Sequence, residues 1–155
     1  MYNIELVSFK DLYNFALINL DYKTESFTSS YYNMYLLFHT YQNIKITLAN
    51  SNIPAAYIFA KNEFNKAEKM KYTHITAISV APMFRRCGFG TILMDMLTKS
   101  SVKNYSFYID LFVRRSNLQA IGFYKKLGYK VHQVCESYYD GPCEDAFDMR
   151  KYLNE

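Results

Sequence analysis

Apolar side chains recur along the chain in two spacings, one typical of strands and one typical of helices. Short runs rich in β-branched and aromatic residues predict strands over residues 4–7, 44–49, 55–60, 74–80, 105–113, 129–139 and 145–151. Apolar residues three and four positions apart predict one helix over residues 11–19 and others beginning near residues 30, 90 and 117. The resulting order, β-α-α-β-β-β-α-β-α-β-β, predicts a mixed α/β sheet in one domain.

Capping residues and loop composition set the expected boundaries of these elements. We expect Ser30 to cap the second helix, and either Ser116 or Asn117 to cap the last one, which Gly128 closes. The segment 61–71 is polar and rich in lysine, so we expect a loop between two strands there.

The first two predicted helices each carry a stripe at helical spacing. The stripe of the first consists of Leu12, Phe15, Ala16 and Asn19. The stripe of the second consists of Tyr31, Met34, Tyr35 and Phe38. Two interpretations of the second stripe stay open: packing in the core, or docking of a partner protein.

Composition narrows the class of protein. A length of 155 residues suits one domain, spanning residues 1–155, with a full core. No apolar run approaches the roughly 18–20 residues of a membrane helix, and no signal-peptide pattern opens the chain. The net charge of +4 is modest, and without a tract of lysine and arginine it does not indicate nucleic-acid binding.

Neither disulfides nor a metal site is indicated. The three cysteines, Cys87, Cys135 and Cys143, form no Cys-x-x-Cys pair, and their odd number fits a reduced cytoplasmic chain. The three histidines, His39, His74 and His132, are too scattered to predict a metal centre.

The stretch 74–95 combines a strand, a basic loop and a helix start. The loop carries Arg85, Arg86, Gly88 and Gly90. Glycines let the backbone approach a ligand, and the free N–H groups at a helix start favour an anion. The spacing matches neither Gly-x-Gly-x-x-Gly nor a P-loop, so neither a dinucleotide-binding fold nor a P-loop nucleotide site is predicted.

Two segments resemble the GNAT superfamily of acetyl-CoA-dependent acyltransferases. Arg85-x-x-Gly88-x-Gly90 resembles its pyrophosphate loop, and residues 117–129 resemble the segment whose asparagine, helix and tyrosine border the cofactor thiol. The resemblance implies a single-domain GNAT fold, with helices flanking a mostly antiparallel central sheet, and acetyl-CoA as cofactor. The cofactor-binding residues that it implies are Ile78, Ser79, Val80, Arg85, Arg86, Cys87, Gly88, Phe89, Gly90, Thr91, Asn117 and Tyr124.

Further strings resemble the catalytic subunits of N-terminal acetyltransferase B (NatB). They are Asn19-Leu20-Asp21, His74-Ile75-Thr76-Ala77, Asp110-Leu111-Phe112-Val113-Arg114 and residues 136–139 and 144–151. NatA catalytic subunits share the cofactor loop and the tyrosine pair, but the first and third strings fit NatB better. The resemblance implies co-translational acetyl transfer to the α-amine of proteins that begin Met-Asp, Met-Glu, Met-Asn or Met-Gln.

The same resemblance implies that His74 and Tyr124 are catalytic. A free α-amine has a pKa of about 7.7–8, so a histidine or a relayed water suffices as its base. Whether His74 is that base or a specificity residue stays open. Tyr124 is expected to protonate the leaving thiolate, and main-chain N–H groups after Ser79 are expected to bind the thioester oxygen.

Substrate contacts are also implied by the resemblance. The residues are Glu25, Phe27, His74, Thr76, Tyr138 and Tyr139. His74 and Thr76 are two apart on a strand and therefore share a face. At most one of Tyr138 and Tyr139 faces the groove if both are extended. Phe27 stands where the family usually has tyrosine, so stacking on the substrate methionine survives while a hydroxyl is absent.

The implied partners are nascent polypeptide N-termini, a large helical auxiliary subunit, and the ribosome through that subunit. Direct nucleic-acid or membrane contact is not expected, and the expected location is the cytoplasm. Two alternatives stay open: a NatA-like enzyme for small N-terminal residues, and a catalytically silent CoA-binding module. The presence of His74 and Tyr124 argues against the silent module.

Overall fold

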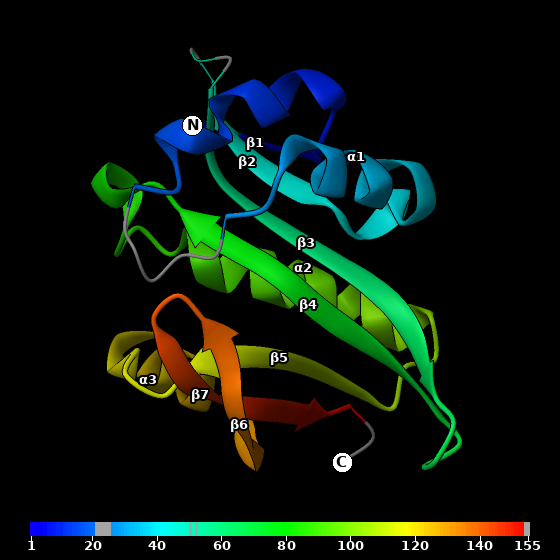
Figure 1. Ribbon diagram of the computed structural model, residues 1–155. Coiled ribbons are helices and arrows are strands. Elements are labelled where there is room, and N and C mark those ends of the chain that lie inside the picture. Colours follow the sequence, from blue (N-terminus) through cyan, green and yellow to red (C-terminus); the bar gives the residue numbers. More distant parts are fainter. Residues whose placement is uncertain (21–25, 50, 52, 154–155) are drawn as a thin grey trace. The chain divides into compact units, whose positions relative to one another are not determined.

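Hydrogen bonding links seven strands in the order β1-β2-β3-β4-β5-β7-β6 in a computed structural model that describes residues 1–20, 26–49, 51 and 53–153 (Figure 1). The strands are β1 (Tyr2–Leu6), β2 (Ile44–Leu48), β3 (Pro54–Asn65), β4 (Met70–Val80), β5 (Tyr108–Arg114), β6 (Lys130–Asp140) and β7 (Cys143–Tyr152). Strands β4 and β5 pair in parallel, whereas β1–β2, β2–β3, β5–β7 and β6–β7 are antiparallel. The predicted mixed, mostly antiparallel sheet is confirmed.

Among the described residues, three α-helices and three 3₁₀ segments accompany the strands. The α-helices are α1 (Ser29–Phe38), α2 (Phe89–Lys103) and α3 (Leu118–Lys126). The 3₁₀ segments are η1 (Phe9–Leu17), η2 (Thr40–Gln42) and η3 (Pro82–Phe84). In the part of the chain that the structure describes, none of these helices has the length and apolar character needed to cross a membrane.

The chain forms two compact units. The first consists of Met1–Lys61 and Thr76–Ser100, and the second of Asn62–Ile75 and Ser101–Glu155. Within the first unit, η1 and α1 lie on one face of the strands and α2 lies on the other (Figure 1).

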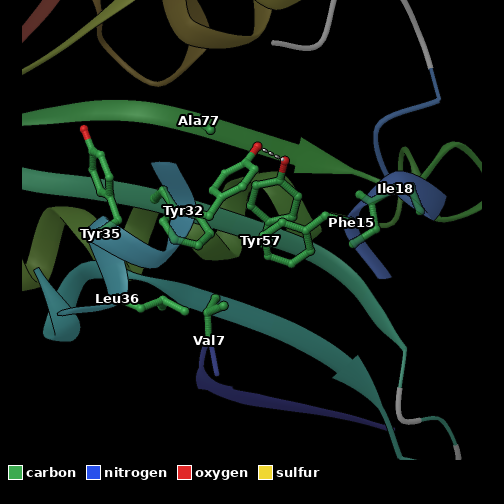
Figure 2. Close-up of a cluster of buried hydrophobic side chains, with 10 residues drawn as sticks. Val7, Phe15, Ile18, Tyr32, Tyr35, Leu36, Tyr57 and Ala77 are labelled. Atoms are coloured by element: carbon green, nitrogen blue, oxygen red, sulfur yellow. Dashed lines mark hydrogen bonds between the residues drawn. The ribbon is translucent and has the colours of Figure 1, made fainter. Parts of the chain in front are cut away.

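An aromatic cluster forms the core of the first unit (Figure 2). The ring of Phe15 in η1 stacks on Tyr57 of β3, with centroids 4.0 Å apart, and meets Tyr32 of α1 edge-on at 5.3 Å. The buried Tyr57 hydroxyl donates to Asn19 Oδ1 at 2.8 Å and lies 3.3 Å from the Tyr32 hydroxyl. Buried aromatic rings therefore supply the apolar contacts while their hydroxyls stay hydrogen-bonded.

The first predicted helix differs from expectation because it is a 3₁₀ segment with a different buried side. Asp11, Phe15 and Ile18 are buried, while Ala16 of the expected stripe is exposed. Asp11, Phe15 and Ile18 are four and three positions apart, so the buried side keeps helical spacing, but it includes Asp11 because that carboxylate pairs with Lys45.

Helix α1 also departs from its predicted stripe. Thr28, and not Ser30, caps it by accepting a hydrogen bond from the Tyr31 N–H at 3.3 Å. Tyr35 is buried as expected, but Met34 and Phe38 are exposed, Phe38 by 74%. Core packing is therefore the wrong interpretation for these last two side chains.

The predicted loop over residues 61–71 is wrong. Strand β3 continues to Asn65 and β4 begins at Met70, so only a tight turn separates them. Asn65 Oδ1 accepts the N–H of Ala67 at 3.0 Å, and Lys69 takes a left-handed φ of 54°. The pairing of two long strands accommodates polar side chains that by composition alone indicate a loop.

Expected boundaries in the second unit are mostly confirmed. Asn117 caps α3 by accepting the Ala120 N–H at 3.2 Å, and Gly128 ends it with a φ of 90°. Strand β5 begins at Tyr108 and not at Tyr105, whose left-handed φ of 58° interrupts an extended strand.

A buried ion pair ties η1 to β2. Asp11 accepts hydrogen bonds from the Ser8 N–H and hydroxyl, both at 2.7 Å, and pairs with Lys45 Nζ at 2.8 Å. Burial by itself raises the pKa of the Asp11 carboxyl, but the bonds from Lys45 and Ser8 outweigh burial and hold its pKa below the ordinary 3.8. The pair therefore stabilises the fold only while Asp11 is ionised.

We predict that Asp11→Asn lowers the free energy of unfolding at pH 7 by about 1–3 kcal/mol, because asparagine cannot pair with Lys45. A depressed folded-state pKa contributes stability above about pH 4 that is lost as the pH falls through the folded-state value. The difference between wild type and variant, measured by urea unfolding from pH 7 to pH 2.5, should therefore shrink below pH 4. Glu5→Gln is the control, since Glu5 contacts Lys45 from an exposed position at 3.4 Å. A difference independent of pH would contradict the prediction.

Candidate active site

The candidate site residues divide between the two units. The first unit holds Phe27, Thr76, Ile78, Ser79, Val80 and the loop and helix start at residues 85–91. The second holds His74, Asn117, Tyr124, Tyr138 and Tyr139. Glu25 lies outside the described residues.

The loop after β4 brings two arginines to the start of α2. Arg85 Nε donates to the Val80 carbonyl at 3.1 Å, which ties the loop to the end of the strand. Arg86 and Gly88 both have left-handed backbones, with φ of 65° and 84°. Glycine is favoured at position 88 by its left-handed backbone conformation. Crowding is not the reason, since no described atom lies within 4 Å of a Cβ placed there. The guanidinium groups and the free N–H groups of the helix suit an anion such as a pyrophosphate.

Side chains around this loop differ in their exposure. Arg86, Cys87, Gly88 and Thr91 are exposed. The Phe89 ring is buried, 5.4 Å from Tyr2 and 6.4 Å from Phe84 between centroids, so Phe89 can offer a ligand only its backbone.

Burial alternates along β4. Ile75, Ala77 and Ser79 are buried, whereas His74 and Thr76 are partly exposed. The prediction that His74 and Thr76 share a face is therefore confirmed.

Ser79 carries an unsatisfied polar group. Its hydroxyl is buried and has no hydrogen-bond partner among the described residues. A buried polar group left unpaired costs about 1–3 kcal/mol, so a ligand or water that completes the bond is favoured at this position.

The side chains at the first unit's predicted substrate positions are held by aromatic neighbours. The Thr76 hydroxyl forms a short hydrogen bond with the Tyr35 hydroxyl. Phe27 stacks on Tyr31, with centroids 4.6 Å apart. Stacking needs no hydroxyl, so phenylalanine at position 27 is compatible with this packing.

His74 is oriented by a buried carboxylate. Its Nδ1 lies 2.8 Å from Asp110 Oδ1, and the two residues face each other in the parallel β4–β5 register. A carboxylate accepts the Nδ1–H, which leaves the Nε2 lone pair of a neutral imidazole as the acceptor. The Phe112 ring lies 5.6 Å from the imidazole centroid.

Sequence reasoning missed Asp110 as the partner of His74. Its signal was a single acidic residue within the apolar strand Tyr108–Arg114, because a buried charge needs a partner.

Tyr124 is a buried phenol on α3. Burial raises the pKa of its hydroxyl, so the group is fully protonated at neutral pH and can act as a proton donor. Asn117, at the start of the same helix, uses its side-chain oxygen as the cap, so only its Nδ2 group is left for a ligand.

Tyr138 and Tyr139 have different surroundings. Tyr139 is 9% exposed, and the Arg114 guanidinium lies 4.0 Å above its ring. Tyr138 is 48% exposed and stacks on Phe112 at 4.7 Å. His74 of β4, Phe112 of β5 and Tyr138 of β6 thus form a row of rings within the second unit.

Comparison with known proteins gives consistent matches over most of the chain. Residues 9–129 match the acetyltransferase (GNAT) family. The chain is 41% identical to the N-terminal acetyltransferase B complex catalytic subunit naa20 of Schizosaccharomyces pombe, over 93% of this chain and 81% of that protein. It is 42% identical to N-alpha-acetyltransferase 20 of Dictyostelium discoideum, over 92% and 81% of the two chains.

A solved structure agrees with these matches. A chain of the NatB acetyltransferase complex bound to CoA and MES is 34% identical, with a TM-score of 0.88 over 97% of this chain and 99% of that one.

We predict that neutral His74 carries its proton on Nδ1, because Asp110 accepts it. The ¹⁵N chemical shifts of the His74 ring should identify Nδ1 as the protonated nitrogen. In an Asp110→Ala variant the proton should redistribute toward Nε2, while His132, which is exposed, should be unaffected and serves as an internal control. An Nε2–H tautomer in the wild type would contradict the hydrogen-bond assignment.

Proposed function

Because this chain belongs to the acetyltransferase (GNAT) family, and within it to the catalytic subunits of N-terminal acetyltransferase B, we propose that His74 and Tyr124 carry out the proton transfers of its reaction. That reaction is the transfer of an acetyl group from acetyl-CoA to the N-terminal α-amine of proteins beginning Met-Asp, Met-Glu, Met-Asn or Met-Gln. The observation that carries the proposal is the 2.8 Å bond between His74 and Asp110.

The residues of the first unit suit acetyl-CoA, which supplies the activated acetyl group. Arg85, Arg86 and the main-chain N–H groups of residues 86–91 bind its pyrophosphate. The main chain of residues 78–80 binds the part near the thioester, where the unpaired Ser79 hydroxyl adds a polar group. The Asn117 amide and Tyr124 are assigned to cofactor binding on the resemblance.

His74 acts as the base toward the substrate amine. With a pKa of about 7.7–8, roughly a tenth of such amines are neutral at pH 7, so the base has one proton to remove during attack. The Nε2 lone pair accepts that proton, since Asp110 occupies Nδ1 and stabilises the imidazolium that forms.

His74 is also a candidate specificity residue, in which role Nε2 would form a hydrogen bond with the substrate's second residue. A neutral Nε2 can accept a hydrogen bond from the amide of Asn or Gln at the substrate's second position, whereas binding Asp or Glu requires a donor. Thr76, on the same face, offers a hydroxyl that can donate to either class.

Tyr124 acts as the general acid toward the leaving thiolate. Its buried hydroxyl is a neutral phenol at physiological pH, and proton donation at this step prevents a full negative charge from building up on sulfur. Donation by a positioned acid needs no covalent enzyme intermediate.

Several side chains are assigned to substrate binding. Phe27 stacks on the side chain of the initiator methionine, and Tyr138, which is half exposed, contacts the peptide backbone. Glu25 is proposed as a further contact on the resemblance alone. Tyr139, beneath Arg114, acts through packing.

The first unit offers a surface for a partner. Exposed apolar side chains are concentrated in and beside η1, α1 and η2: Phe9, Tyr13, Leu17, Leu20, Met34, Leu37, Phe38 and Tyr41. Exposed apolar side chains in such number are characteristic of protein–protein contacts. We propose that they bind a large helical auxiliary subunit, which associates the enzyme with the ribosome in the cytoplasm. The NatB structure named above is itself a complex.

The two units are proposed to make one acetyltransferase domain over residues 1–155. The family match over residues 9–129 supports this, because it takes in segments of both units.

A peptide panel tests the function. We expect residues 1–155, assayed with the auxiliary subunit, to acetylate peptides that begin Met-Asp and Met-Asn. Ser-Ala peptides, Met-Leu peptides and an N-blocked peptide containing lysine should remain unmodified by mass spectrometry. Preferred transfer to Ser-Ala would indicate NatA-like action, and transfer to the blocked peptide alone would indicate a lysine acetyltransferase. Acetyl-CoA binding without transfer to any peptide would indicate a silent module.

Removing one hydroxyl tests the proposed acid. Tyr124→Phe should lower kcat on a Met-Asp peptide by about 10²–10⁴-fold with both KM values nearly unchanged, because only proton donation is lost. Tyr129→Phe is the matched control, since Tyr129 is also buried and its ring lies 6.0 Å from Tyr124. Equal losses in both variants would mean that the hydroxyls act on the fold and not on the reaction.

A further inference from the structure

Strand β6 contains a bulge just before Tyr138. The pairs Cys135–Ala146 and Tyr139–Glu144 are in register, but between them residues 136–138 lie opposite only Asp145. The bulged Ser137 has a φ of 49°, in the left-handed region that favours glycine. A specific set of contacts must therefore hold this conformation.

The bulge breaks the alternation of side chains along β6. Tyr138 stacks on Phe112, and Tyr139 lies beneath Arg114, yet Phe112 and Arg114 are two apart and share one face of β5. The rings of Tyr138 and Tyr139 are accordingly only 5.0 Å apart. The expectation that neighbouring tyrosines point to opposite sides assumed a regular strand and does not apply here.

Arg114, at the end of β5, contacts both sides of the β6–β7 connection. Its guanidinium covers the Tyr139 ring, donates to the Pro142 carbonyl at 3.3 Å, and pairs with Glu144 Oε2 at 3.5 Å. Glu144 Oε1 in turn accepts the Ser116 N–H at 2.6 Å. These bonds fasten the connection to the end of β5.

Asp145 of β7 and Arg115, which directly follows β5, hold the bulge itself. Asp145 Oδ1 accepts the N–H of Ser137 at 3.0 Å, and its Oδ2 pairs with Arg115 at 2.9 Å. The bond from Ser137, followed by Arg115, keeps the pKa of the Asp145 carboxyl below its usual value. The backbone N–H of the left-handed Ser137 is thus hydrogen-bonded to a charged acceptor.

We propose that Arg114 is a positioning residue for the peptide substrate. By holding Tyr139 and Glu144, the register pair directly after the bulge, Arg114 supports the bulge from the turn side, while Asp145 holds Ser137 within it. The bulge places Tyr138 over Phe112, in the row of rings that includes His74. This inference rests on the proposed contact between Tyr138 and the peptide. It predicts an effect on peptide binding and none on acetyl-CoA binding.

Arg150 is a matched comparator for Arg114. Both arginines are 8% exposed, and Arg150 also lies over a tyrosine, 4.5 Å above the Tyr108 ring. Arg150 pairs with Asp148 at 3.2 Å and Glu68 at 3.1 Å, and both lie outside the bulge and its turn. Loss of either arginine removes a buried charge and leaves its carboxylate partners unpaired. Of the two arginines, only Arg114 contacts the β6–β7 connection.

The test compares Arg114→Met and Arg150→Met in residues 1–155, assayed with the auxiliary subunit. Arg114→Met should raise KM for a Met-Asp peptide and lower kcat/KM by about 10–100-fold, with KM for acetyl-CoA unchanged. Arg150→Met should lower the melting temperature to a similar extent but leave the peptide KM unchanged. Equal changes of the peptide KM in both variants, or an unchanged peptide KM in Arg114→Met, would overturn the inference.

A double-mutant cycle separates this inference from the proposed function. If Arg114 acts through Tyr138, adding Arg114→Met to Tyr138→Ala should reduce kcat/KM no further than Tyr138→Ala does alone. An unchanged peptide KM in Tyr138→Ala would instead refute the substrate contact of Tyr138. Should Arg114→Met fail to fold, Glu144→Gln keeps the acceptor for Ser116 while removing the charge, and a smaller rise of the peptide KM is expected.

Discussion

Buried charge is the constraint on which the second unit depends. Asp110, Arg114, Asp148 and Arg150 are each less than a tenth exposed, and a buried charge is stable only when it is paired. Asp110, Arg114 and Arg150 each pair with a residue on another strand or turn, whereas Asp148 pairs with Arg150 on its own strand. Asp110 fixes the orientation of His74, Arg114 fixes the turn after β6, and Arg150 joins β7 to Glu68 in the β3–β4 turn. The same ion pairs that hold these strands together also orient candidate site residues, His74 directly and Tyr139 through Arg114.

In the first unit, neutral hydrogen bonds rather than ion pairs satisfy the polar groups of the aromatic core. Its core is built from aromatic rings whose hydroxyls bond to one another and to Asn19, so the rings contribute apolar area without leaving unpaired oxygens. Tyr35 extends this network to Thr76 at the edge of the predicted substrate site. Ser79 is an exception, and its unpaired hydroxyl lies in the segment that is proposed to border the thioester.

The proposed chemistry requires two proton carriers in different states, and the surroundings of His74 and Tyr124 suit these two roles. His74 has one nitrogen committed to a carboxylate, which leaves the other free to accept a proton. Tyr124 is buried, and burial keeps its hydroxyl neutral. Acceptor and donor are thus distinguished by local environment, an ion pair for one and burial for the other, and not by residue type alone.

The sequence by itself determined the local features of this protein. The order of strands and helices, the arginine–glycine loop before α2 and the Asn117 and Gly128 caps of α3 depend on residues close together in the chain, and all are present. Tertiary structure alone decided the 3₁₀ form of η1, the long β3–β4 hairpin, the bulge before Tyr138 and the pairing of His74 with Asp110, 36 positions apart. Propensity and spacing are properties of a short window. A bulge or a buried ion pair instead depends on which distant residues come to face each other, and only the folded chain specifies that.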